Sequence, residues 1–212
     1  MKNTIAPTTL KPMILRASLT SPYGRKVRIA AHVLGISDLI NVVHADTLDP
    51  EDTVRVENPL GKLPTLLLSD GRSIFDSRTI LEFFHDSVSS SMLLPSDPLG
   101  KALMRTQIAL CDGITDASLL LVYEGRFREN TTYSDRWLSH QRGKIFRALD
   151  KVSNDLPPLS LAYGSSISLV CALGYLDWRQ PVEWRIDYPK VADWLKQISI
   201  LDPAVAATAI PT

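Results

Sequence analysis

Three short stretches of the sequence hold residues that can bind a small charged molecule, and the first surrounds Ser21. Ser21 stands directly before Pro22, a pair typical of the start of a helix. A hydroxyl at that place, together with the positive end of the helix, can hold a negatively charged group such as a thiolate. The same pair also makes an ordinary helix cap, and spacing alone favours the cap.

The other two stretches are residues 62–64 and the pair Asp76 and Ser77. A proline such as Pro64 is common at the first residue of a strand. Asp76 and Ser77 indicate a turn and a helix cap, but Ile80 occupies the position of the acidic residue that completes a capping box. Capping alone therefore does not fully account for this pair.

Strands and helices alternate over the first part of the chain, and they must position these stretches. The helix that begins at Pro22 is amphipathic, with Arg25 and Lys26 on its polar side and Gly35 as a left-handed cap at its end. Short hydrophobic runs predict strands, and capped or amphipathic segments predict helices. The strands are expected over 13–18, 40–45, 62–68 and 73–75, and the helices from residue 22, over 50–57 and from residue 77.

The second part of the chain has helical periodicity almost throughout. A Ser- and Pro-rich segment separates the two parts, and its Leu93 and Leu94 are expected to anchor it. The helices are expected over 99–122, 133–152 and 167–178, from residue 189 and from residue 202, with the third of them buried. We therefore expect a disordered lead-in over 1–12, an α/β domain over 13–86, a linker over 87–97 and an all-helical domain over 98–212.

Composition and spacing argue against several classes of function. The 212-residue chain carries 23 basic and 23 acidic residues, so no overall field favours nucleic acid or an anionic membrane as partner. The longest hydrophobic run, 167–176, is shorter than the roughly 18 to 20 residues of a membrane span. The four histidines lack metal-ligand spacing, so no metal site is expected. Cys111 and Cys171 are expected to be inert core thiols, and this cysteine usage without a secretory signal indicates a cytoplasmic protein.

Four segments carry a resemblance to a known family. Residues 21–28 (SPYGRKVR), 58–64 (NPLGKLP) and 75–80 (FDSRTI) resemble, in order and spacing, the three N-terminal signatures of the glutathione S-transferase family. Residues 174–179 (GYLDWR) are similar to a run common in its bacterial members, so the resemblance covers about residues 13 to 201. It implies a thioredoxin-like α/β N-terminal domain of βαβαββα order with a mixed sheet, an all-α C-terminal domain, and usually a homodimer.

The resemblance also implies a reaction and a catalytic residue. The usual reaction is attack by the thiolate of glutathione, the co-substrate, on a small hydrophobic electrophile, with no metal. Serine-type members hold the thiolate with the Ser that precedes the Pro-aromatic pair, which corresponds to Ser21. Thr20 and Ser18 are the alternatives.

A glutathione-binding set follows from the same resemblance. A cis bond before Pro64 would expose the backbone N–H and C=O of Leu63 to the cysteinyl part of glutathione, and Lys62 would meet its glycine carboxylate. Asp76 would bind the ammonium of the γ-glutamyl end, and Ser77 with the helix terminus its carboxylate. Most members carry Glu where this chain has Asp76.

The second-substrate pocket is less specific. Family members place part of it after the end of the long helix, where Tyr123 and Arg126 stand, and Leu19 would add an apolar wall. An exposed helix end with ordinary basic residues explains Tyr123 and Arg126 equally well. The electrophile is therefore left open between conjugation, isomerisation, ether cleavage, dehalogenation and peroxide reduction. A non-catalytic binding or stress-response module with this architecture is the alternative function.

The start of the buried helix departs from the family pattern. Bacterial relatives usually place Ser or Thr there, with Asp three residues later, as a local cap. The corresponding positions in this chain are Tyr163 and Ser166. We expect Ser165 or Ser166 to cap the helix instead.

Overall fold

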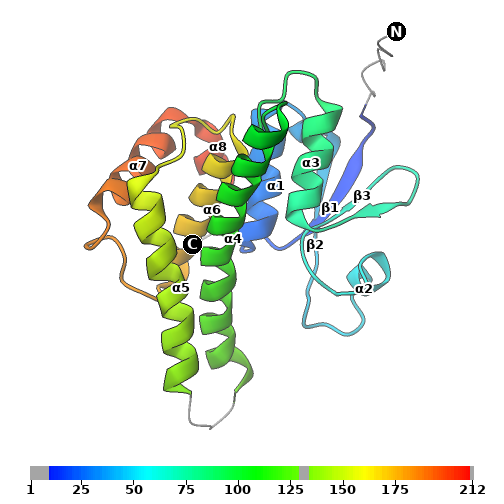
Figure 1. Ribbon diagram of the computed structural model, residues 1–212. Coiled ribbons are helices and arrows are strands. Elements are labelled where there is room, and N and C mark those ends of the chain that lie inside the picture. Colours follow the sequence, from blue (N-terminus) through cyan, green and yellow to red (C-terminus); the bar gives the residue numbers. More distant parts are fainter. Residues whose placement is uncertain (1–9, 129–133, 211–212) are drawn as a thin grey trace.

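The computed structural model describes residues 10–128 and 134–210, which form a small sheet with helices and a bundle of helices beside it (Figure 1). The lead-in expected over 1–12 falls mostly on residues 1–9, which lie outside the described residues. No helix within the described ranges combines the length and apolar character needed to cross a membrane.

In the described residues the first part is built on a mixed four-stranded sheet of order β2-β1-β3-β4. β1 pairs parallel with β2 and antiparallel with β3, which pairs antiparallel with β4. The element order confirms the predicted βαβαββα arrangement of a thioredoxin-like domain and adds one 3-10 turn. The elements are β1 (Met13–Ala17), α1 (Pro22–Val33), η1 (Ser37–Leu39), β2 (Ile40–His44), α2 (Val54–Glu57), β3 (Thr65–Leu67), β4 (Ser73–Ile74) and α3 (Ser77–Ser87).

The second part contains five helices in the described residues, as predicted. α6 packs against both α4 and α1 and lies beside α4 in Figure 1, and residues 164–173 of α6 are all buried, which confirms the expected central helix. Leu93 and Leu94 are buried too, so they anchor the segment between the two parts. The helices are α4 (Pro98–Phe127), α5 (Asp135–Asn154), α6 (Gly164–Arg179), α7 (Pro189–Leu201) and α8 (Pro203–Ala207).

β1 carries different side chains on its two faces. Leu15 and Ala17 are buried in the hydrophobic core that also contains Val27 of α1. Because side chains alternate along a strand, Arg16 points to the opposite face, where its guanidinium meets Glu57 of α2. One strand therefore contributes both to the core and to a polar network that is described with the site.

α1 begins and ends with the caps that the sequence predicts. Ser21 is its N-cap residue. At the other end Gly35 has a φ of 68°, and its N–H donates to the carbonyl of His32 at 3.1 Å. The N–H of Ile36 donates to the carbonyl of Ala31 at 2.9 Å. This is the Schellman arrangement, in which a left-handed glycine lets the chain leave the helix.

The polar side predicted for α1 is wrong at Arg25 and Lys26, which are 6% and 1% exposed. Lys26 Nζ forms an ion pair with the Asp112 carboxylate of α4. The other oxygen of Asp112 accepts from Arg78 Nε at 2.9 Å. Periodicity indicates which side of α1 faces the sheet, but α4 and α6 cover its other side, so charged residues there need buried partners.

Arg25 makes a second buried connection between the two parts. Its Nη2 donates to the carbonyl of Val205 at 2.9 Å, and its Nε donates to Thr208 Oγ1 at 3.4 Å. A Cβ on Gly174 of α6 would collide with Arg25 Nη1. Glycine at this position of the GYLDWR run therefore leaves room for a guanidinium from the other part of the chain.

α4 extends five residues past its predicted end at residue 122, to Phe127. Tyr123 and Arg126 therefore lie within the helix rather than after it, which corrects the prediction. Glu124 and Arg128 form an i,i+4 ion pair at 2.7 Å across the last turn. Such a pair supports helical structure at an end that sequence periodicity does not reveal.

The expected cap of α6 is also wrong. Tyr163 is the N-cap residue and makes no side-chain cap bond. Ser166 Oγ donates instead to the carbonyl of Pro158 at 2.7 Å, and the N–H of Gly164 donates to the carbonyl of Leu93 at 3.0 Å. A backbone carbonyl from the preceding linker thus does part of the work that a side-chain cap does elsewhere.

Cys111 and Cys171 are buried free thiols. Burial raises the pKa of Cys111 to about 12 and that of Cys171 to about 11. Both thiols are therefore protonated at neutral pH, and the prediction that they are core residues is confirmed.

Candidate active site

The register of the sheet brings the three stretches to one end of it. Arg16 of β1 lies opposite Thr65 of β3, so the loop that follows β1 runs beside the segment that precedes β3. Ile74 of β4 lies opposite Leu66 of β3, so the chain reaches the start of α3 at the same end. The loop with Ser21, the segment before β3 and the start of α3 are therefore neighbours.

Ser21 is partly buried at the N-terminus of α1, and its Oγ accepts a hydrogen bond from the N–H of Gly24 at 3.2 Å. This bond occupies an oxygen lone pair and leaves the hydroxyl hydrogen to be donated to a ligand. Capping and anion binding are therefore compatible in one conformation, although the sequence alone presents them as alternatives.

The two alternatives to Ser21 bond to each other. Ser18 Oγ and Thr20 Oγ1 are 2.8 Å apart, and Ser18 Oγ also accepts from the N–H of Thr20 at 3.3 Å. Their mutual bond uses one of their two hydroxyl hydrogens. Ser21 is also the one of the three that caps α1, so the geometry favours it as the residue that faces an anion at this helix terminus.

Asn58 holds the loop before β3, although the sequence indicates it only as a turn residue. It is 1% exposed, and its Nδ2 donates to the carbonyl of Lys62 at 3.0 Å and to Thr65 Oγ1 at 3.2 Å. Gly61 has a φ of 57°, a conformation that glycine adopts without strain. A buried amide and one left-handed glycine therefore set the course of residues 58–65.

The Leu63–Pro64 peptide bond is cis, as predicted. Leu63 precedes the pairing of β3 with β1, which begins at Thr65. Its backbone therefore stands beside the strand without a place in the ladder, and the side chain of Lys62 is exposed next to it.

Asp76 is the N-cap residue of α3, and its Oδ1 accepts from the N–H of Arg78 at 3.0 Å. The Phe75–Asp76 peptide bond is also cis. Ser77 is the first residue of the helix and is 3% exposed. A hydroxyl and backbone N–H groups at a helix N-terminus form a natural site for a carboxylate.

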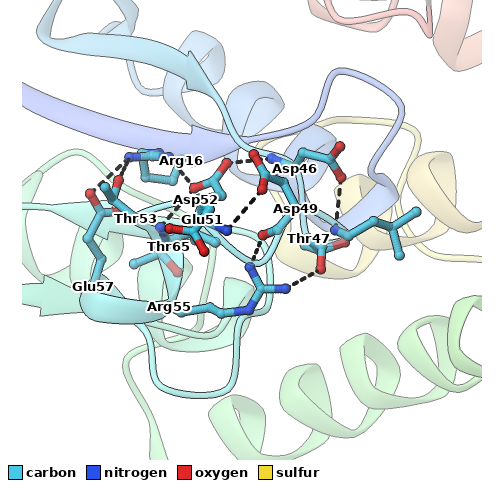
Figure 2. Close-up of polar contacts among 12 residues, drawn as sticks. Arg16, Asp46, Thr47, Asp49, Glu51, Asp52, Thr53, Arg55, Glu57 and Thr65 are labelled. Carbon is cyan, nitrogen blue, oxygen red and sulfur yellow. Dashed lines mark hydrogen bonds and ion pairs between the residues drawn. The ribbon is translucent and has the colours of Figure 1, made fainter.

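Arg16 holds the segment that leads to the loop of residues 58–65 (Figure 2). The sequence alone assigns no role to Arg16. Its guanidinium donates to Asp52 Oδ1 at 2.7 Å, to Thr53 Oγ1 at 3.0 Å and to Glu57 Oε1 at 2.9 Å. The only signal is a charged residue at an alternate position of a hydrophobic strand. Its acidic partners lie more than 30 residues away, so local spacing cannot identify them.

Further bonds close the same segment (Figure 2). Hydrogen bonds from the N–H groups of Val54 and Asp46 lower the pKa of Asp52, despite its partial desolvation, and the charge of Arg16 acts in the same direction. Arg55 donates to the carbonyl of Thr47 at 2.8 Å. The weak helix predicted here is thus one turn, α2, inside a polar network.

Tyr23 connects the Ser21 end of α1 to α4. Its hydroxyl donates to Asp116 Oδ1. Burial raises the pKa of Tyr23, and the hydrogen bond and charge of Asp116 raise it further, so the phenol stays neutral. Sequence reasoning missed this contact, for which the only signal is the aromatic residue after Ser21-Pro22.

The residues predicted for a second-substrate pocket lie near this bridge. Tyr123 is seven residues after Asp116, so both lie on one face of α4. Arg126 Cζ lies 5.5 Å from the centroid of the Tyr123 ring. Leu19 is 42% exposed in the loop before α1. The structure thus places Tyr123 on the side of α4 that faces the start of α1.

Tyr175 and Arg179 of α6 join the same group, which sequence reasoning missed. Burial raises the pKa of Tyr175, while the charge of Arg179 and its hydrogen bond to the Tyr175 hydroxyl lower it; Tyr123 raises it and the charge of Arg126 lowers it. Such couplings require these side chains to lie close together. The signal in the sequence is the i,i+4 spacing of Tyr175 and Arg179 within the GYLDWR run.

Chemically, this arrangement can hold an anionic group at the start of α1 with an extended peptide beside it. Its donors are hydroxyls, backbone N–H groups and cationic side chains. Within residues 10–128 and 134–210, no cluster of His, Cys, Asp and Glu is arranged to hold a metal ion.

Comparisons with known proteins agree with this architecture. Residues 20–87 match the family described as "Glutathione S-transferase, N-terminal domain". The uncharacterized GST-like protein YibF of Escherichia coli is 34% identical over 192 residues, which cover 88% of this chain and 93% of that protein. A glutathione transferase family member from Pseudomonas fluorescens, solved with bound glutathione, is 36% identical with a TM-score of 0.87, over 94% of this chain and 100% of that one. A structure of a family member from the same organism with bound S-(propanoic acid)-glutathione is 37% identical with a TM-score of 0.83, over the same shares.

Proposed function

The chain belongs to the glutathione S-transferase family, and on that premise we propose that it is a glutathione transferase, which activates the glutathione thiol for attack on a small electrophile. The observation that carries this proposal is the Ser21 hydroxyl at the N-terminus of α1. It accepts the capping bond from Gly24 at 3.2 Å and so keeps its hydrogen for a thiolate. The family and the two buried free thiols support a cytoplasmic location.

We propose that glutathione lies along the end of the sheet where the three stretches meet. The backbone of Leu63 pairs with its cysteinyl part, and Lys62 faces its glycine carboxylate. Asp76 binds the ammonium of the γ-glutamyl end, and Ser77 with the N-terminus of α3 binds its carboxylate. Asp76 uses Oδ1 to cap α3, which leaves Oδ2 for the ammonium. The solved relatives that bind glutathione support this placement.

In the proposed reaction the thiol proton leaves to solvent and the sulfur forms a bond to the electrophilic carbon. When the electrophile is an aryl halide, the carbon–halogen bond breaks and the halide departs with the bonding electrons. The pocket for the electrophile is formed by Leu19, Tyr123 and Arg126. Ser21 stabilises the thiolate and is the only side chain to which we give a catalytic role.

Two measurements on the wild-type protein test this function. Calorimetry measures glutathione affinity, and a conjugation assay with 1-chloro-2,4-dinitrobenzene and further electrophiles measures turnover. Binding together with turnover supports the transferase. Binding without turnover on any electrophile of the panel would favour a non-catalytic binding module, and absence of both would contradict the proposal.

Replacing Ser77 with alanine is expected to weaken glutathione binding by roughly 10-fold, because one charge-assisted hydrogen bond to the γ-glutamyl carboxylate is lost while the N–H groups of α3 stay. The thiol pKa of bound glutathione is expected to change little. Calorimetry and a pH titration of the bound thiol check the two results. Thr79→Ala, an exposed change on the same helix, is the control and should leave both values unchanged. An unaltered affinity in Ser77→Ala would contradict the proposal that Ser77 binds the γ-glutamyl carboxylate.

We propose a homodimer. An apolar-lined pocket of ≈ 280 Å³ lies between α3 and α4, with Leu81 and Ile108 among its lining residues. Leu99 and Leu103 are 69% and 58% exposed on α4 nearby. Arg72 and Arg78 already have ion-pair partners within the chain, because Arg72 pairs with Asp70 at 2.6 Å and Arg78 with Asp112 at 2.9 Å. Light scattering at micromolar concentration is expected to give twice the 23.5 kDa chain mass, and a monomer mass would contradict this expectation.

A further inference from the structure

Two arginines near the proposed electrophile pocket stack on aromatic rings. Arg126 Cζ lies 5.5 Å from the ring centroid of Tyr123, and Arg179 Cζ lies 3.6 Å from that of Trp178. Stacking uses the face of a guanidinium and leaves the N–H groups on its edge available. An edge of that kind matches the two oxygens of a carboxylate.

Neither arginine has a carboxylate within ion-pair distance in the part of the chain that the structure describes. The acids two residues before each arginine are occupied, because Glu124 pairs with Arg128 at 2.7 Å and Asp177 pairs with Arg185 at 2.7 Å. The Nε of Arg179 is buried and has no hydrogen-bond partner in the described residues. Among the described residues, these two positively charged side chains thus stack on aromatic rings without an ion-pair partner.

Two further acids of α4, Asp112 and Asp116, lie against α1, where they contact Lys26 and Tyr23. Asp116 lies on the same face of α4 as Tyr123 and accepts a hydrogen bond from the hydroxyl of Tyr23. It is about 15 Å from Arg126 along the helix axis. Asp112 is balanced by Lys26 and Arg78. The positive charge is therefore concentrated at the far end of the pocket from the start of α1.

Arg126 lies on the same side of the molecule as Ser21. Tyr23, in the first turn of α1, bonds to Asp116 of α4, and Tyr123 lies two turns further along the same face, about 10 Å away. Helical side chains lean toward the helix N-terminus, so Arg126 leans back toward Tyr123 and the start of α1. The separation of about 10 Å between the start of α1 and Tyr123 suits an electrophile about one or two aromatic rings long.

We propose that the electrophile taken by this protein carries a carboxylate, which Arg126 and Arg179 bind while the reactive carbon faces the thiol held at Ser21. This inference rests on the proposed transferase function and names its substrate class. Tyr123 and Tyr175 flank the unsaturated or aromatic body of the acceptor. For a chlorinated nitrobenzoate, the thiolate sulfur bonds to the carbon that carries chlorine, and chloride leaves with the electrons of the broken bond. The carboxylate keeps its charge throughout.

Binding of finished conjugates tests the inference without any turnover. S-Benzylglutathione and S-(4-carboxybenzyl)glutathione differ by one carboxylate, and calorimetry gives the dissociation constant of each. The carboxylated conjugate is expected to bind the wild-type protein at least 10-fold more tightly, because a charge-assisted bidentate contact is added. Equal affinities, or weaker binding of the carboxylated conjugate, would overturn the inference. If neither conjugate binds and glutathione does not bind either, the proposed function fails with it.

Two variants locate the carboxylate. Arg126→Gln is expected to reduce the affinity ratio of the two conjugates by roughly 10-fold, and Arg126→Lys by less, because lysine keeps the charge but loses the fork. Arg128→Gln is the matched control, because it removes the same charge only two residues from Arg126. The guanidinium of Arg128 already pairs with Glu124 at 2.7 Å. Its affinity ratio is expected to stay within about two-fold of wild type. An equal fall in Arg126→Gln and Arg128→Gln would show a general field effect and overturn the assignment.

Turnover gives an independent readout. The kcat/KM for 4-chloro-3,5-dinitrobenzoate, divided by that for its methyl ester and corrected for the uncatalysed rates, is expected to exceed one and to fall in Arg126→Gln. Comparable turnover of acid and ester would leave the transferase function standing and overturn the carboxylate preference. The two failures are therefore distinguishable.

Discussion

Replacing Ser21 with alanine is expected to slow conjugation roughly 10- to 100-fold at neutral pH while leaving glutathione affinity nearly unchanged. In the proposed site the hydroxyl acts on the thiolate, whereas affinity comes from the ends of the peptide at Lys62, Asp76 and Ser77. The pKa of bound glutathione is expected to rise in the variant, so its conjugation rate recovers at higher pH. Rates and ultraviolet absorption of the thiolate, both measured against pH, check the result.

The energies involved are of the right size. A thiol with an ordinary pKa of about 8.5 is roughly 3% ionised at pH 7, and lowering that pKa by about two units makes about three quarters of it thiolate. That shift corresponds to about 2.7 kcal/mol. One charge-assisted hydrogen bond contributes about 1.5 to 3 kcal/mol and a helix N-terminus about 0.3 to 1 kcal/mol. Loss of the hydroxyl therefore removes most of the stabilisation.

Ser18→Ala and Thr20→Ala are the matched controls, because both remove a hydroxyl within three residues of Ser21. Their side chains bond to each other at 2.8 Å, so we expect near-parental rates from each. If Ser21→Ala conjugates at the wild-type rate with an unchanged pH profile, Ser21 does not stabilise the thiolate. A slow Thr20→Ala or Ser18→Ala variant would then identify the residue that takes it.

Features that depend on near neighbours in the chain could be predicted from the sequence. The Ser21 cap and the left-handed Gly35 are set by residue types within a few positions, and the structure has both. The cis bond before Pro64, which the structure also has, was expected from the family resemblance. The element order and the division between an α/β part and a helical part follow from hydrophobic periodicity in the same way. Local chemistry was sufficient there because the relevant partner was the backbone itself.

Features that depend on distant partners could not be predicted. Arg16 meets acids 36 to 41 residues away, and Arg25 meets Val205 across 180 residues. Periodicity assigned Arg25 to solvent because it detects one buried face of a helix and not a second layer packed on the other. The cap of α6 failed for the same reason, since a carbonyl of Leu93 takes the bond that a nearby side chain was expected to make.

The buried charges between α1 and α4 are expected to give the largest effect on stability. The side chains of Lys26 and Asp112 are 1% and 2% exposed and form an ion pair. The second oxygen of Asp112 accepts a hydrogen bond from Arg78 Nε at 2.9 Å. Asp112→Ala leaves Lys26 buried without its carboxylate, and breaking a buried pair in this way costs about 3 to 5 kcal/mol. For a chain of this size that lowers Tm by roughly 6 to 20 °C, which calorimetry or circular dichroism measures.

An exposed pair between the same two parts of the chain provides the control. Arg105 of α4 and Glu82 of α3 are 2.7 Å apart, with side chains 49% and 39% exposed. Glu82→Ala is expected to cost less than about 1 kcal/mol, because both groups are solvated and screened. The double variant Lys26→Met/Asp112→Leu removes both buried charges and is expected to recover most of the lost Tm, since apolar residues of similar volume replace a buried pair at little cost. Arg78 loses its partner in that variant, but its side chain is 49% exposed, so water can solvate its charge. If Asp112→Ala melts no lower than Glu82→Ala, burial of this pair does not hold α1 against α4.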